Sequence, residues 1–84
     1  MRRRSPAHTK RLLARNLRRL RQENAWSQHD LADEANVRQA LVSSIEVAKA
    51  NPTIESLDMI AAAFGVDVAD LLNAQEEPER TTKP

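Results

Sequence analysis

Signals that begin and end α-helices recur at short intervals along most of this 84-residue chain. Two segments, Ser27-Gln-His-Asp30 and Asp67-Val-Ala-Asp70, have the form of a capping box, in which two side chains cap backbone N–H groups of the first turn reciprocally. Thr53 is a further candidate N-cap. Asn36 and Gly65 tolerate the left-handed backbone that ends many helices. The spacing of these signals predicts short helices joined by very short connections.

Apolar residues repeat at helical spacing between these signals, and no segment shows the alternation typical of a β-strand. Leu13, Leu17 and Leu20 form one stripe of a helix expected from about residue 9 to residue 25. Four shorter helices are expected at residues 28–35, 38–47, 54–64 and 68–72. The expected fold class is therefore all-α, with five helices.

The two ends of the chain lack apolar side chains that would anchor them. Residues 1–8 contain an arginine run followed by Pro6 and are expected to form a flexible basic arm, and the polar residues 74–84 a disordered tail. The helical domain is then expected over residues 9–73. A domain this small buries only about 60% of its unfolded surface, so its stability should be marginal and a partner subunit would help.

The composition excludes several classes of protein. Without cysteine there is no disulfide framework, thiolate metal site or thiol nucleophile, and no apolar run is long enough to span a membrane. His8 and His29 have no metal-ligand spacing to another donor, and no Gly-rich phosphate loop or paired-carboxylate site occurs. We expect a cytoplasmic protein that is not an enzyme, with no cofactor, metal or evident small-molecule ligand.

Charge is divided sharply along the chain, although the net charge is only +1. Residues 1–21 carry nine of the 13 Lys and Arg residues and no acid, whereas residues 22–84 carry the other four and all 12 acids. Such segregation predicts a polyanionic partner at the basic end, either nucleic acid or an acidic membrane surface. A solvated basic helix face is the alternative.

The middle of the chain has the layout of a helix-turn-helix, two short helices joined by a three-residue turn. Ala32 is small enough for a close helix crossing, and Asn36 suits an unusual backbone conformation in the turn. Val37, Val42 and Ile45 are apolar where the second helix must be held against its neighbours. The pattern favours a helix-turn-helix, although such residues also coincide by chance in helical proteins.

Several separated motifs strengthen this interpretation. They are Leu17-Arg-Arg-Leu-Arg21, Trp26-Ser-Gln-His-Asp-Leu-Ala32, Val42-Ser-Ser-Ile-Glu46, Asn51-Pro-Thr-Ile-Glu-Ser-Leu57 and Ile60-Ala-Ala-Ala-Phe-Gly-Val66. In their order and spacing these motifs resemble the Xre/phage-repressor helix-turn-helix family. The resemblance covers residues 13–72. It implies a lambda-repressor-like DNA-binding domain, usually dimeric, whose third helix enters the major groove of an inverted-repeat operator. With no second domain expected, the chain is grouped with restriction–modification controller proteins, phage and plasmid repressors and some antitoxins.

The resemblance also implies roles for individual residues. Gln39 occupies a base-reading position and suits bidentate contact to adenine, Arg38 suits a guanine edge or a phosphate, and Ala40 a thymine methyl. Ser43 fills another outward position of this helix. Phosphate contacts are expected from Gln28, Ser27, Ser44, Lys49, Arg2, Arg3, Arg4, Arg11 and Arg15.

Arg21 and Glu46 match a family pair that forms a structural ion pair between the first and third helices. Val47 and Ala48 replace the Arg-Gly that many members carry after this glutamate. We infer that phosphate affinity is relocated to the basic end of the chain, whose first residues either follow the DNA backbone or a minor groove, or attract DNA non-specifically.

Three hypotheses about function follow. The leading one is a homodimeric transcriptional regulator whose two-fold interface is formed by Phe64, Val66, Val68, Leu71 and Leu72. The second is an antitoxin or adaptor that uses the same fold to bind a protein. The third, attachment of residues 2–21 to membranes, is weak because the leucine stripe is needed for the core.

Overall fold

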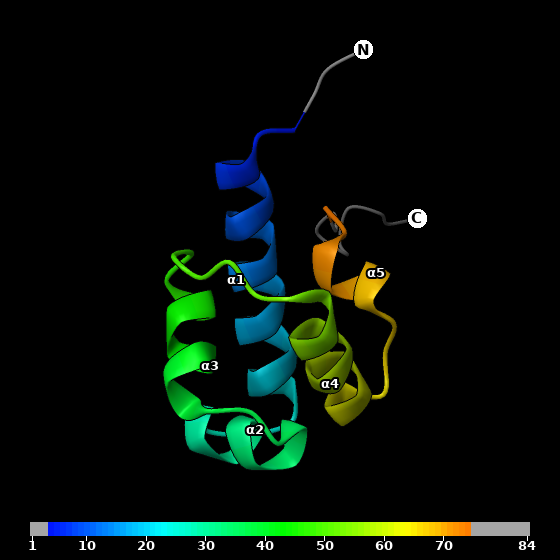
Figure 1. Ribbon diagram of the computed structural model, residues 1–84. Helices are drawn as coiled ribbons and strands as arrows, with labels where there is room; N and C mark the ends of the chain where they lie inside the picture. The colour runs from blue at the N-terminus through cyan, green and yellow to red at the C-terminus, as the bar shows by residue number, and fades with distance from the viewer. Residues whose placement is uncertain (1–3, 75–84) are drawn as a thin grey trace, which may run out of the picture.

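The computed structural model describes residues 4–74, and over that range it contains five α-helices and no strand (Figure 1). The helices are α1 (Pro6–Glu23), α2 (Gln28–Ala35), α3 (Gln39–Glu46), α4 (Ile54–Phe64) and α5 (Val68–Leu72). The expected all-α fold with five helices is confirmed. None of the described helices is both long and apolar enough to cross a bilayer.

The long helix α1 runs through the length of the domain, and the shorter helices pack around it (Figure 1). α3 and α5 contact α1, while α2 lies across one end and contacts α3 and α4. All five helices contribute to one core, whose buried members are Leu13, Leu17, Leu31, Ala32, Ala35, Val42, Ile45, Leu57, Ile60, Ala61 and Leu71. This core fixes the orientation of α2 and α3, the two helices of the expected helix-turn-helix.

The first helix begins earlier than the sequence pattern indicated. The Ser5 hydroxyl accepts a hydrogen bond from the backbone N–H of His8, and Pro6 occupies the first helical position, where its missing N–H costs nothing. The expectation of a flexible arm over residues 1–8 was therefore wrong for residues 6–8. Residues 1–3 of the expected arm and residues 75–84, nearly all of the expected tail, lie outside the described residues.

The predicted capping signals of α2 are confirmed in detail. Ser27 and Asp30 cap each other's backbone N–H groups, both at 2.9 Å, and these bonds lower the pKa of Asp30. A lowered carboxyl pKa means that this cap stabilises the helix above the unfolded-state pKa and is lost as the pH falls through the lowered value. Asn36 at the end of α2 (φ 58°) and Gly65 at the end of α4 (φ 73°) both adopt the left-handed conformation.

Ala48, two residues after the end of α3, also has a left-handed backbone (φ 62°). A side chain with a Cβ is strained there by about 1 kcal/mol, so Ala48→Gly should raise the free energy of unfolding by about 0.5–1 kcal/mol and Tm by roughly 2–8 °C. Thermal unfolding followed by circular dichroism measures this shift. Ala62→Gly, at an exposed position inside α4, is the matched control and should lower stability by a similar amount. Equal destabilisation by both changes would show that Ala48 carries no strain.

Candidate nucleic-acid interface

The first turn of α3 presents three consecutive exposed residues, Arg38, Gln39 and Ala40. Ser43 lies on the same side of the helix, one turn further on, and is half-buried. The opposite side of α3 is held in the core by residues such as Val42, which is fully buried. The core therefore fixes the helix while the four residues predicted to read bases share its outer side.

The N-terminus of α3 differs from those of α1, α2 and α4. Ser5, Ser27 and Thr53 accept a backbone hydrogen bond at the start of α1, α2 and α4, whereas Arg38 at the start of α3 makes no such bond. The first N–H groups of a helix have no partner within it and carry a partial positive charge. α3 therefore presents backbone donors beside the side chains of Arg38 and Gln39, a combination suited to an anionic partner.

A buried carboxylate joins the helices behind this surface. Glu46 accepts hydrogen bonds from Arg21, at 2.7 Å from Nε and 3.0 Å from Nη2, and from Gln28 Nε2 at 3.0 Å. Arg21 also donates to the carbonyl of Trp26 at 2.9 Å. The hydrogen bond to Glu46 raises the pKa of the Arg21 guanidinium above its ordinary value. Because these residues come from α1, α2 and α3 and the segment before α2, the network sets the position of α3 relative to its neighbours.

Gln28 is therefore less free than the sequence alone suggested. One hydrogen of its Nε2 group is directed to Glu46, so only the second hydrogen and the backbone N–H remain to donate to a phosphate. The Ser27 hydroxyl is likewise already engaged within the domain, because its oxygen accepts a hydrogen bond from the backbone N–H of Asp30. The Ser27–Asp30 bond was predicted as a capping box, whereas the Gln28–Glu46 bond was missed because it depends on how α2 packs against α3, not on local spacing.

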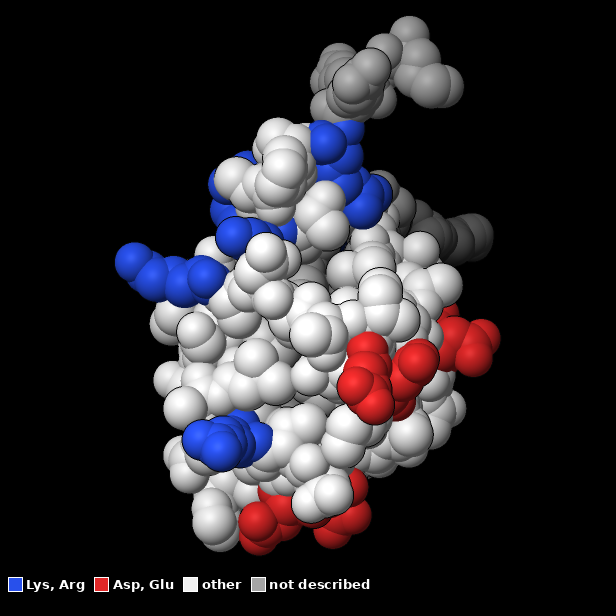
Figure 2. Space-filling model, viewed as in Figure 1, with Lys and Arg blue, Asp and Glu red and all other residues white. Residues whose placement is uncertain are grey.

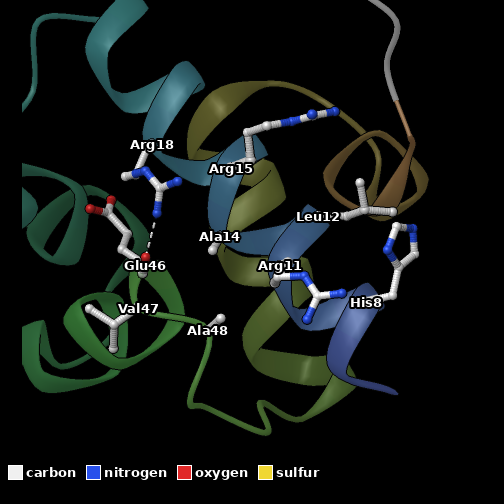
Figure 3. Close-up of a pocket in the computed structure, with 9 residues that line it drawn as sticks. All are labelled: His8, Arg11, Leu12, Ala14, Arg15, Arg18, Glu46, Val47 and Ala48. Carbon is white, nitrogen blue, oxygen red and sulfur yellow. Dashed lines mark hydrogen bonds between the residues drawn. The ribbon is translucent and has the colours of Figure 1, made fainter. Parts of the chain in front are cut away.

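A concave basic surface lies between α1 and the end of α3. The cavity has a volume of about 510 Å³, and Arg11, Arg15 and Arg18 line it together with Val47 and Ala48. In Figure 3, Arg18 reaches across to α3, where its Nη1 donates to the backbone carbonyl of Glu46, whereas Arg15 extends away from α3. Of the three arginines, Arg18 is thus the one that reaches α3, whereas the side chain of Arg11 is directed toward His8.

Arg18 was not among the residues predicted to contact DNA. It lies three residues before Arg21 and therefore shares the side of α1 that faces α3. That spacing is the feature of the sequence that could have identified Arg18 as a neighbour of α3. The guanidinium of Arg18 is bonded to the last turn of α3. A cation at this end also offsets the partial negative charge of the helix dipole.

The other predicted phosphate-binding residues are distributed over a wider area. Lys49 is exposed in the loop after α3, and Ser44 is half-buried on α3 itself. Arg4 donates to the carbonyl of Leu72 at 3.2 Å and so lies against the end of α5. Arg2 and Arg3 lie outside the described residues.

The predicted dimer interface needs correction at one residue. Leu71 is fully buried within the subunit, because the short helix α5 inserts this side chain into the core against α1. Asn16 of α1 holds the same region by donating to the carbonyls of Leu71 and Asn73, at 2.8 and 2.9 Å. Leu71 is consequently unavailable for an intersubunit contact.

The remaining predicted interface residues are only partly free. Phe64 stacks on Trp26, with ring centroids 5.5 Å apart, and Val66, Val68 and Leu72 are half-buried against the core. The large apolar side chains that are exposed in the described part of the chain are those of Val47 and Ile54, and neither belongs to the predicted interface.

Comparison with known proteins identifies a family. Residues 17–71 match the model of a helix-turn-helix family, HTH_3. The HTH-type transcriptional regulator DdrOP3 of Deinococcus deserti is 36% identical over 64 residues, which cover 76% of this chain and 50% of that protein. The HTH-type transcriptional regulator SinR of Bacillus licheniformis is 33% identical over 69 residues, covering 81% and 62% respectively. The chain thus spans about half to three-fifths of the length of these relatives.

A solved structure supports the same grouping. The crystal structure of a hypothetical transcription factor, NHTF, from Neisseria has a TM-score of 0.76 and 29% sequence identity to this chain. The match covers 95% of this chain and 90% of that one.

Proposed function

Because the chain belongs to the HTH_3 helix-turn-helix family, whose members bind DNA and are not enzymes, we propose that it is a sequence-specific transcriptional regulator. It binds an inverted-repeat operator as a homodimer, with α3 in the major groove. The observation that carries this proposal is the outer side of α3, where three consecutive exposed residues adjoin an uncapped helix N-terminus. The relatives named as transcriptional regulators support the same role.

Base recognition is assigned to the first turn of α3 and the residue one turn beyond. The amide of Gln39 pairs with adenine through one donor and one acceptor, and the guanidinium of Arg38 pairs with guanine or with a phosphate. Ala40 contacts a thymine methyl group, and Ser43 makes a direct or water-mediated contact. All four lie on one side of a helix whose other side is fixed in the core.

Phosphate contacts are assigned to groups around α3. Gln28 and Ser27 act at the start of α2, and Lys49 and Ser44 at or after the end of α3. Phosphate contacts are also assigned to the basic residues at the start of the chain, Arg2, Arg3, Arg4, Arg11 and Arg15. Figure 2 shows basic side chains gathered over the start of α1, while acidic side chains lie over α4 and the opposite end of the domain. This asymmetry orients the domain toward a polyanion.

Removing two phosphate contacts should weaken all DNA binding alike. Arg11→Gln combined with Lys49→Gln should reduce affinity for the operator and for random DNA by the same factor. The slope of log K against log salt should fall by about 1.8, which corresponds to two phosphates. Fluorescence anisotropy titrations at several salt concentrations measure both quantities.

The matched control is Arg19→Gln, because Arg19 already pairs with Glu23 at 3.2 Å. The salt slope of this variant should stay unchanged. An unaltered slope in the double variant would remove Arg11 and Lys49 from the contact surface.

The small size of the domain supports the homodimer, because a partner subunit buries surface that a domain of this size leaves exposed. Selection of binding sites from random duplex DNA with the full chain tests the proposal. We expect an inverted repeat whose half-sites are centred about 10–10.5 base pairs apart, one helical turn. Enrichment of a single, unrepeated site would contradict binding as a symmetric dimer.

A further inference from the structure

A second concave surface lies on the side of the domain where α1 starts. It has a volume of about 330 Å³ and is enclosed by α1, the loop before α4 and the end of α5. Its apolar lining includes Leu13, Leu57, Leu72 and Pro52. We call this surface the α1–α5 groove. None of the residues assigned to base recognition lines it, so it can be covered without obstructing the outer side of α3; of the assigned phosphate contacts, the described residue Arg4 lines it.

An exposed apolar side chain stands next to the α1–α5 groove. Ile54, the first residue of α4, is 70% exposed, more than Val47 at 60%, the other exposed large apolar residue in the described part of the chain. Ile54 lies one turn before Leu57, which lines the groove, so the two side chains are neighbours on α4. An apolar projection and an apolar recess are therefore adjacent on one surface.

Opposite charges flank this surface on its two sides. Lys10 of α1 lines the groove, whereas Glu55 and Asp58 follow Ile54 on α4. Among the residues that the structure describes, none of these three takes part in an ion pair. In Figure 2 the same face of the domain shows basic side chains over the start of α1 and acidic side chains over α4.

We propose that this face is the two-fold interface of the homodimer, with Ile54 of each subunit inserted into the α1–α5 groove of its partner. A two-fold rotation applies one patch to its own copy. The basic side of each subunit then meets the acidic side of the other, which places Lys10 opposite the partner's Glu55 and Asp58. The arrangement buries the most exposed large apolar residue of the described chain and pairs three charges that have no ion-pair partner within it. It rests on the proposed homodimer, and of the interface residues predicted around α5 it keeps only Leu72.

Matched substitutions of the two exposed apolar residues test the inference. Sedimentation equilibrium of the full chain should show a dimer, and Ile54→Ser should raise the dimer Kd at least tenfold, as expected for losing a buried apolar side chain. Val47→Ser, the control, should leave the Kd unchanged. Both positions are exposed, and circular dichroism checks that both variants fold.

A charge exchange tests the predicted pairing independently. Lys10→Glu and Asp58→Lys should each raise the dimer Kd several-fold, because each places like charges opposite one another. Combining them in one chain should restore most of the lost affinity, since both copies of the pair are then re-formed with the signs reversed. Additive losses in the combined variant would overturn the predicted pairing.

The outcomes separate this inference from the proposed function. A wild-type dimer whose Kd is left unchanged by Ile54→Ser overturns the interface and leaves the proposed operator-binding dimer standing. A wild-type protein that remains monomeric at high micromolar concentration overturns both the interface and binding as a preformed homodimer.

Discussion

Glu46→Ala should lower the free energy of unfolding by about 3–5 kcal/mol, a large part of the total stability of a domain of this size. The carboxylate of Glu46 is buried and accepts two hydrogen bonds from Arg21 and one from Gln28. Its removal leaves the guanidinium of Arg21, whose side chain is only 17% exposed, without its charge partner. The resulting fall in Tm should be at least about 12 °C.

Urea unfolding followed by circular dichroism measures this loss. Glu34→Ala, which removes an exposed acid from α2, should change stability by no more than about 0.5 kcal/mol. Replacing both partners, as in Arg21→Met with Glu46→Leu, should cost less than Glu46→Ala alone, because no buried charge is then left unpaired. A double variant that loses the full sum of two separate single losses would show that the pair is not coupled as its geometry indicates.

Gln39→Ala should reduce affinity for the operator by about 1–3 kcal/mol, or roughly 5- to 150-fold, and change affinity for random DNA very little. A bidentate amide contact is made only with the matching base, so its loss affects the specific complex alone. The substitution should not alter folding, because Gln39 is exposed on α3 and its side chain makes no hydrogen bond within the described part of the chain.

Competition titrations with the selected operator and a scrambled duplex distinguish the two effects. Gln22→Ala is the matched control, since Gln22 is an exposed glutamine on α1 outside the proposed interface. It should leave both affinities unchanged. If Gln39→Ala weakened binding to both duplexes equally, Gln39 would be a phosphate contact and not a base-reading residue.

Most features of this fold that the sequence predicted are controlled by neighbouring residues; the Arg21–Glu46 ion pair between α1 and α3, which the structure contains at 2.7 Å, was predicted from the family resemblance. The capping box of Ser27 and Asp30 and the left-handed ends at Asn36 and Gly65 depend on interactions within a single turn. The early start of α1 was also local, because Ser5 and Pro6 form a good N-terminus. It was missed because the arginine run and the absence of an apolar anchor favoured an arm.

The features that the sequence did not predict depend on packing between helices. Gln28 bonds to Glu46, 18 positions away, and Arg18 bonds to the carbonyl of Glu46, 28 positions away. Leu71 carries the same apolar side chain as Leu72, yet only Leu71 is fully buried, because the short helix α5 turns that side toward α1. The burial of a side chain on a five-residue helix cannot be read from periodicity over so few positions.

The proposed interface likewise depends on helix packing that the sequence alone does not reveal. Ile54 has the same apolar character as the core residues Leu57 and Ile60 of α4, and only the packed structure shows that it is exposed beside a groove. The sequence placed the dimer contact near the C-terminal helix because apolar residues are concentrated there. Several of those residues are instead used within the subunit.

The central claim is that this domain recognises a DNA sequence and does not merely attract polyanions. The most direct test is a titration of the full chain, at two salt concentrations, against the selected duplex and a scrambled duplex of the same length. We predict that the selected duplex binds at least about 10³-fold more tightly than the scrambled one at both salt concentrations. Equal affinities for the two duplexes, both falling steeply with salt, would contradict sequence-specific recognition and reduce the basic surface to non-specific attraction.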